Sequence, residues 1–186
     1  MEKSLIDKIE PHFYYNALEY INSMAIINNV SEISEVAISL GKMMRYWTDR
    51  EDQWIKVSNE MHYIEEYLTI SKLRYMDAFN FKVENNVDEE RKCPIYILEP
   101  IINEIILNIV QSDNKREIII KSEILKDNIL FNISIIAEKN EYDLIEIVRA
   151  EDIKEIEERL LSLAGSNIDI ICEKNFFKIN YVVSER

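Results

Sequence analysis

Residues 5–27 read LIDKIEPHFYYNALEYINSMAII, and this stretch predicts how the fold begins. Its apolar side chains recur at the spacing of a single helical seam: Ile6, Phe13, Ala17, Tyr20, Met24 and Ile27. Such a seam is typical of a helix that packs one face against other helices. Pro11 interrupts it. Because proline inside a helix costs about 3 kcal/mol, we expect the helix to begin there or to be kinked.

A second apolar stripe follows a turn that we expect at Asn28-Asn29. Ser31 is placed to cap a helix with acidic residues in its first turn. The stripe consists of Ile33, Val36, Ala37, Leu40, Met44 and Trp47. Two antiparallel helices cannot cover two apolar stripes by themselves. We therefore expect a hairpin that is completed by another chain as a four-helix dimer.

The rest of the chain predicts helices and strands in alternation. We expect Ser58 to cap a third helix, and the alternation of apolar and polar residues from Phe79 onward indicates a half-buried strand. In order there follow an apolar helix over 97–110 opened by Pro94, a hairpin of 117–125 and 129–137, a helix over 153–164, and a hairpin of 168–172 and 176–183. This order predicts an α+β sandwich with helices on one face of a mixed sheet.

Composition excludes several functions. The 22 basic and 35 acidic residues give a net charge of −13, so we expect no nucleic-acid partner. The only glycines, Gly41 and Gly165, leave no glycine-rich phosphate loop. Two cysteines and two histidines lack the spacing of a zinc site, so no metal is predicted. No apolar run approaches the roughly 20 residues of a membrane helix. We expect a cytoplasmic chain without direct membrane contact.

Four segments, in a fixed order, resemble those of a known family. They are the Pro-His-Phe-Tyr-Tyr-Asn run at 11–16, LGKMMRYW at 40–47, VSNEMHYIEEYLTISKLRY at 57–75, and Leu-Glu-Pro at 98–100. The family is that of the LytS/YehU-type sensor histidine kinases. Residues 5 to 112 resemble it well, and the remainder does so only in the order of its elements. Four segments in the right order are more specific than a single short motif.

The resemblance implies a division of the chain. Residues 1–56 would form the helical dimerisation and phosphoacceptor region, 57–78 a connecting helix, and 79–186 an ATP-binding α/β sandwich of the GHKL type. It also implies that His12 is the phosphoacceptor and that Asn16 belongs to its site. The other histidine lies in the third helix, where ordinary packing or a solvated position is expected.

The ATP-binding motifs of the family are altered here. Asn103 and Glu104 stand where the family has Glu-Asn, and this swap turns each group by about 100° around the helix. Asn108 is a further neutral amide on that helix, and Glu138 stands near the place of the adenine-binding Asp with no glycine after it. Residues 150–155 replace a glycine-rich turn by an acidic one that repels phosphate. These changes predict a pseudokinase.

Three readings stay open at this point. In the first, a degenerate module dimerises through residues 2–47, as a homodimer or with an active kinase. It then receives phosphate on His12 in trans, passes signals to a response regulator and needs no cofactor. In the second, a divergent active kinase binds ATP and Mg²⁺ through Asn103, Glu104, Asn108 and Glu138 and phosphorylates His12. In the third, the chain only oligomerises. Because family members usually carry an upstream sensor, the parent protein could be membrane-anchored.

Overall fold

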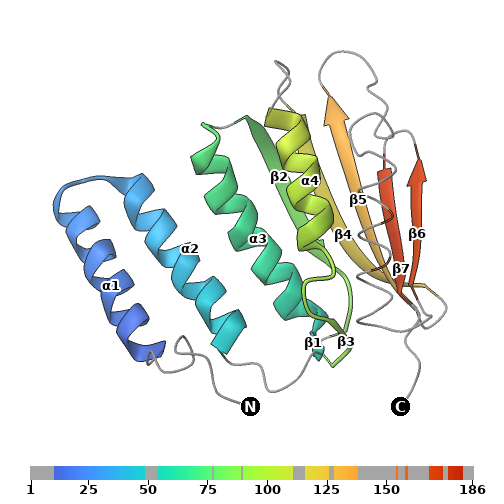
Figure 1. The fold of residues 1–186 in the computed structure, drawn as a ribbon, viewed down its shortest axis with the longest axis horizontal. Helices are drawn as coiled ribbons and strands as arrows, with labels where there is room; N and C mark the ends of the chain where they lie inside the picture. Colours follow the sequence, from blue (N-terminus) through green and yellow to red (C-terminus); the bar gives the residue numbers. More distant parts are fainter. Residues whose placement is uncertain are drawn as a thin grey trace.

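The computed structural model describes residues 11–48, 54–76, 78–88, 90–110, 116–125, 128–137, 168–173 and 176–181, together with Lys154 and Glu158. In these ranges the helices are α1 (Pro11–Ile27), α2 (Ser31–Thr48), α3 (Val57–Arg74) and α4 (Glu99–Val110). The strands are β1 (Trp54–Lys56), β2 (Phe79–Asn85), β3 (Lys92–Pro94), β4 (Arg116–Leu125), β5 (Asn128–Ala137), β6 (Ile168–Glu173) and β7 (Phe176–Tyr181). A helical hairpin followed by a mixed sheet with helices confirms the predicted α+β class (Figure 1).

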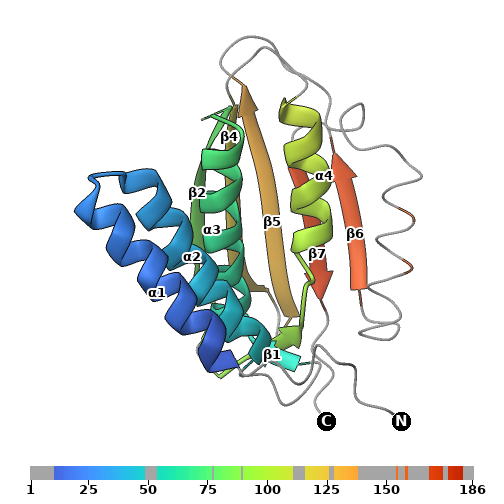
Figure 2. The ribbon, with the colours of Figure 1, turned by 60° about the vertical axis from the view of Figure 1, so that its left-hand side comes forward.

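Helices α1 and α2 form the predicted antiparallel hairpin and lie side by side in Figures 1 and 2. The turn at Asn28-Asn29 is confirmed. Asn29 adopts a left-handed backbone with φ of 55°, which asparagine tolerates better than most residues. The N–H of Val30 donates to the carbonyl of Ala25 at 2.9 Å and closes the turn. The chain therefore reverses within a few residues, which brings the start of α1 next to the end of α2.

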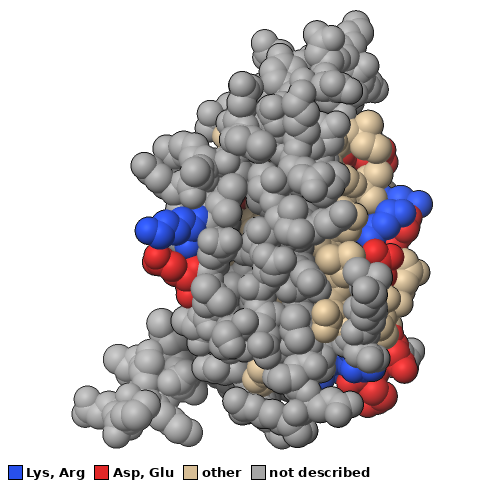
Figure 3. Space-filling model, turned by 90° about the vertical axis from the view of Figure 1, so that its right-hand side faces the viewer, with Lys and Arg blue, Asp and Glu red and all other residues tan. Residues whose placement is uncertain are grey.

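Five strands form one mixed sheet in the order β2-β4-β5-β7-β6. β2 pairs with β4 in parallel, and the other three pairings are antiparallel. Both predicted hairpins are present, as β4–β5 and β6–β7. Helices α3 and α4 lie over the same face of the sheet (Figure 2). On the view of Figure 3, described basic and acidic side chains lie beside one another. On neighbouring strands β4 and β2, Lys121 contacts Glu84 at 2.9 Å.

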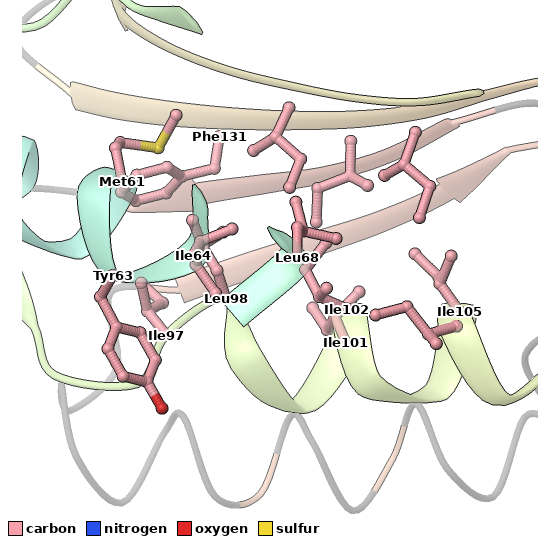
Figure 4. Close-up of a cluster of buried hydrophobic side chains, with 14 of the residues drawn as sticks. Met61, Tyr63, Ile64, Leu68, Ile97, Leu98, Ile101, Ile102, Ile105 and Phe131 are labelled. Carbon is pink, nitrogen blue, oxygen red and sulfur yellow. The ribbon is translucent and has the colours of Figure 1, made fainter. Parts of the chain in front are cut away.

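The core lies between this pair of helices and the sheet. Ile64 and Leu68 from α3, Ile102 and Ile105 from α4, and Phe131 from β5 are completely buried and fill that space (Figure 4). Each such side chain stabilises the fold by about 1.5–3 kcal/mol through its burial. Because α3 shares this core with α4, the third helix belongs physically to the sandwich.

A second, two-stranded sheet was not expected from the sequence. β1 pairs antiparallel with β3, and the N–H of Val57 donates to the carbonyl of Arg91 at 2.9 Å. Pro94 ends β3 and does not open a helix, because α4 begins at Glu99. The cap predicted at Ser58 is also wrong. Lys56 occupies the capping position of α3, and its side chain makes no capping hydrogen bond. This small sheet holds the start of α3 against the segment that leads into α4.

Candidate functional site

His12 and Asn16 form a contact on the exposed side of α1. They are four residues apart, which places both side chains on one helix face. The Nδ2 of Asn16 lies 3.0 Å from the Nδ1 of His12, and the tautomer of the ring sets which atom donates. With Nδ2 as the donor, the ring proton lies on Nε2. A half-turn of the carboxamide presents Oδ1 instead, which accepts from Nδ1–H and leaves the Nε2 lone pair available. Asn16 can therefore select the nucleophilic tautomer.

A groove of about 780 Å³ runs between α1 and α2, and His12 lines it. Tyr15 lines the same groove from α1, and Lys42 and Arg45 line it from α2. The guanidinium of Arg45 lies 6.0 Å from the centre of the Tyr15 ring, within the range of a cation–π contact. The Tyr15 hydroxyl and the Thr48 hydroxyl are hydrogen-bonded at 3.0 Å. These contacts tie the first turns of α1 to the last turn of α2.

The two cations of the groove have different surroundings. Lys42 donates to Glu66 of α3 at 2.6 Å, and Glu66 is only 5% exposed. The Nε2 of His62 lies 3.6 Å from the same carboxylate. His62 is itself exposed on the surface of α3, as expected for a solvated position. The charge of Lys42 is therefore largely compensated inside the helical layer.

The apolar seam of α1 is largely uncovered in the single chain, whereas in the stripe of α2 only Ile33 and Trp47 are exposed and Ala37 is buried. Phe13, Tyr20 and Ile27, spaced by seven residues on α1, are 65%, 67% and 72% exposed. Other large apolar side chains exposed on the two helices are Ile21, Met24, Ile26, Ile33, Ile38 and Trp47. An apolar surface of this extent usually marks a protein interface. We call Phe13, Tyr20, Met24 and Ile27 the apolar stripe of α1.

A buried carboxylate joins the hairpin to the sandwich. Glu60 of α3 has no exposed surface, and the hydroxyl of Tyr46 from α2 donates to it. The N–H groups of Tyr96 and Leu98, just before α4, donate to its two oxygens at 3.2 and 3.3 Å. Burial raises the pKa of Glu60 to about 7, although the hydrogen bond from Tyr46 and those from the backbone oppose this. Burial and the nearby Glu60 charge also raise the pKa of Tyr46.

Three tyrosines surround this carboxylate. The rings of Tyr46 and Tyr63 stack with centres 4.2 Å apart, and Tyr96 meets both rings edge-on at 5.4 and 5.7 Å. Tyr63 also donates to Glu99 at 2.7 Å. The junction thus combines residues from three of the four family-like segments. The sequence revealed these residues only as markers of the family, because their contact depends on positions far apart in the chain.

Three of the four residues predicted for a nucleotide site, Asn103, Glu104 and Asn108, lie on α4. This helix is in a different layer from α1, the helix that carries His12 (Figure 1). The Oδ1 of Asn103 accepts from the Tyr67 hydroxyl at 2.9 Å, and the Nδ2 of Asn108 donates to the carbonyl of Glu104 at 2.8 Å. Each of these two amides thus makes one hydrogen bond to a neighbour. Glu138 lies outside the described residues. Among the described part of the chain, no group of three or more His, Cys, Asp or Glu residues could hold a metal ion.

Several known proteins similar to this chain are sensor histidine kinases or sensor proteins. Residues 2–79 match the family model "Histidine kinase". The sensor histidine kinase YesM of Bacillus subtilis (strain 168) is 32% identical over 101 residues, which is 53% of this chain and 17% of YesM. The sensor histidine kinase YpdA of Escherichia coli (strain K12) is 30% identical over 112 residues, 59% of this chain and 19% of YpdA. The sensor protein LytS of Staphylococcus saprophyticus is 25% identical over 139 residues, 71% of this chain and 23% of LytS.

These matches confirm the predicted resemblance to LytS-type sensor histidine kinases. Over the matched residues the chain is similar to sensor histidine kinases. It spans about a fifth of the length of the curated relatives that it matches. None of the described helices is long and apolar enough to cross a membrane.

Proposed function

We propose that the chain is a pseudokinase module of a two-component system. In this proposal His12 receives a phosphoryl group in trans from an active partner kinase, and the nucleotide site has lost its function. The observation that carries the proposal is a contrast between two sets of residues. His12 and Asn16 are exposed on a groove, whereas Asn103 is held by Tyr67.

Exposure and tautomer control support His12 as a phosphoacceptor. A nucleophilic imidazole needs one nitrogen free and the other hydrogen-bonded. Asn16 can provide that bond at Nδ1, and the groove leaves room for a donor.

The contacts on α4 support the loss of nucleotide binding. In the family the Asn that serves Mg²⁺ stands at the position of Glu104. Here the amide lies one residue earlier, at Asn103, and its oxygen accepts from the Tyr67 hydroxyl. Recruiting Asn103 for a metal would leave that hydroxyl without its acceptor, at a cost of about 1–3 kcal/mol if it stays buried. The altered sequence at Glu138 and at 150–155 adds to this argument, although those residues lie outside the described ranges.

The partners follow from the exposed surface and from the resemblance. The apolar stripe of α1 suits a second hairpin, from another copy or from an active kinase, and completes a four-helix bundle. A response regulator would then exchange phosphate with His12. The module would work on the cytoplasmic side, as part of a membrane-anchored sensor or beside one.

A calorimetric titration of the chain with ATP and Mg²⁺ tests the proposal. We expect no heat and no thermal stabilisation at millimolar nucleotide, and no labelling of His12 from the γ-phosphate. Adding an active kinase of the same family should then label the wild-type chain and leave the His12→Gln variant unlabelled. Micromolar binding together with self-labelling of His12 would replace the proposal by the active-kinase alternative. Labelling by neither route would leave an oligomerisation module.

A further inference from the structure

We propose that Arg45 binds the phosphoryl group carried by His12, inside the groove between α1 and α2. This inference rests on the proposed role of His12 as phosphoacceptor and adds the residue that would hold the transferred group. The ligand class is a phosphoryl dianion attached to an imidazole nitrogen. The groove that both residues line is large enough to contain it, at about 780 Å³.

The contacts of α1 and α2 bring Arg45 to the correct end of the groove. Its guanidinium lies 6.0 Å from the Tyr15 ring, and Tyr15 is three residues after His12, so the two α1 side chains are neighbours on the helix surface. The Tyr15–Thr48 hydrogen bond at 3.0 Å fixes the last turn of α2 against the first turns of α1. Arg45, three residues before Thr48, is therefore held at the level of His12.

The groove is lined by one carboxylate, Glu19, and by two basic residues, Lys42 and Arg45. Of the two basic residues, the contacts point to Arg45 as the partner of the phosphoryl group. Lys42 already contacts the buried carboxylate of Glu66 at 2.6 Å. Arg45 contacts an aromatic ring, and no carboxylate among the described residues forms an ion pair with it. In a chain of net charge −13, a new dianion needs a local cation. A guanidinium can donate two parallel hydrogen bonds to phosphoryl oxygens, which makes it a good partner for this group.

The residue after Arg45 explains why the guanidinium faces this way. Tyr46 is buried, stacks on Tyr63 and donates to Glu60. Consecutive residues of a helix point about 100° apart, so fixing Tyr46 in the junction turns Arg45 toward α1. The groove also lies on a different side of α1 from the apolar stripe, because Phe13 directly follows His12. A partner hairpin on that stripe would leave the groove open.

Potassium phosphoramidate tests the inference without any kinase. The Nε2 lone pair of His12 attacks phosphorus, the bond from phosphorus to the amine nitrogen breaks, and ammonia leaves. The product carries the phosphoryl group on Nε2, and Nδ1–H stays hydrogen-bonded or releases its proton to water. Neither reactant is oxidised or reduced in this step. His62, which is also exposed, serves as an internal reference in the same chain.

The measurement is the rate of phosphorylation at each histidine, followed by ³¹P NMR and by mass spectrometry of peptides. We expect Arg45→Ala to slow the modification of His12 about tenfold and to leave His62 unchanged, since only His12 loses its anion partner. The rate at His12 in Arg45→Lys should lie between those of the wild type and Arg45→Ala, because an ammonium keeps the charge without the bidentate geometry. Raising the salt concentration should slow the wild-type reaction at His12 more than that of Arg45→Ala. Arg74→Ala, which removes another exposed arginine over a tyrosine ring, is the matched control.

Equal rates at His12 in the wild type and in Arg45→Ala, with intact thermal unfolding curves, would overturn the inference. So would a parallel loss of reactivity at His12 and His62, which would show a general structural effect. The proposed function fails in a different way. If phosphoramidate modifies His12 with the expected dependence on Arg45 but no kinase labels it, the binding site stands and the trans-phosphorylation does not.

Discussion

Family-like residues gather in two places in this molecule, and the two places differ in burial. At the junction, Glu60 is inaccessible and accepts from Tyr46, Tyr96 and Leu98. On α1, His12 is exposed, and in the described structure its side chain forms one hydrogen bond, to a residue of its own helix. The first arrangement holds elements together, and the second leaves a nucleophile accessible. A shared motif residue therefore indicates chemistry in one place and architecture in the other.

The largest effect is expected from breaking the junction. Glu60→Ala removes the acceptor of one hydroxyl and two backbone N–H groups, each worth about 1–3 kcal/mol when left unsatisfied. We expect a loss of about 4 kcal/mol or more in the free energy of unfolding, measured by urea denaturation and circular dichroism. Glu65→Ala, on the exposed side of the same helix, should change it by at most about 0.5 kcal/mol. Similar losses in both variants would contradict the role of the junction.

The same carboxylate should make stability depend on pH. The pKa of Glu60 is raised from 4.5 to about 7, so between these values the folded chain binds more protons than the unfolded chain. Stability from this group is therefore highest below pH 4.5 and is lost as the pH rises toward 7, by about 3 kcal/mol in total. Glu60→Gln should flatten this part of the stability curve between pH 5 and 8. An unchanged slope in that variant would show that another group titrates.

Periodicity explains which parts of this contrast the sequence could predict. The seams of α1 and α2, the strand alternation from Phe79 and both late hairpins are local patterns, and they give the fold class. The contact of His12 with Asn16 follows from helical spacing alone. The pairing of β1 with β3 could not be predicted, because two three-residue strands far apart in the chain carry too little pattern. The contacts of Glu60 and Arg45 could not be predicted either, because they join residues that are far apart in the chain.

On the exposed hairpin, the expected dimer interface can be disrupted at the apolar stripe of α1. Tyr20→Glu places a charge in the middle of the expected four-helix interface. We expect the dissociation constant of the dimer to rise about 100-fold or more, equivalent to about 2.7 kcal/mol, by analytical ultracentrifugation. Met76→Glu is a matched control, because Met76 is a large apolar residue that is 91% exposed outside the hairpin. A wild-type chain that stays monomeric at high concentration would rule out self-association through this stripe.

Substitutions of Asn16 test more directly how the reactivity of His12 is controlled. Asn16→Leu removes the hydrogen bond to Nδ1, and we expect phosphoramidate to modify His12 about tenfold more slowly. Asn16→Asp should restore or exceed the wild-type rate, because a carboxylate only accepts from Nδ1–H and so favours the lone pair on Nε2. His62 again provides the reference rate within each variant. If Leu and Asp variants react alike, Asn16 does not set the tautomer.

The smallest effect concerns Asn103, where the architectural and chemical interpretations can be separated. Tyr67→Phe removes the hydroxyl that donates to Asn103, and Tyr63→Phe removes the neighbouring contact to Glu99 one helical turn away. We expect each variant to lose about 1 kcal/mol of stability, because a part-buried hydrogen bond contributes about that much. The titration with ATP should stay flat in both, as in the wild type. If Asn103 instead belonged to a working metal site, freeing it from Tyr67 would change nucleotide affinity in Tyr67→Phe alone. The difference in nucleotide affinity between the two phenylalanine variants, measured by calorimetry, therefore decides between two roles for Asn103. Asn103 is either a structural residue, like those of the junction, or a residue of a working site, like His12.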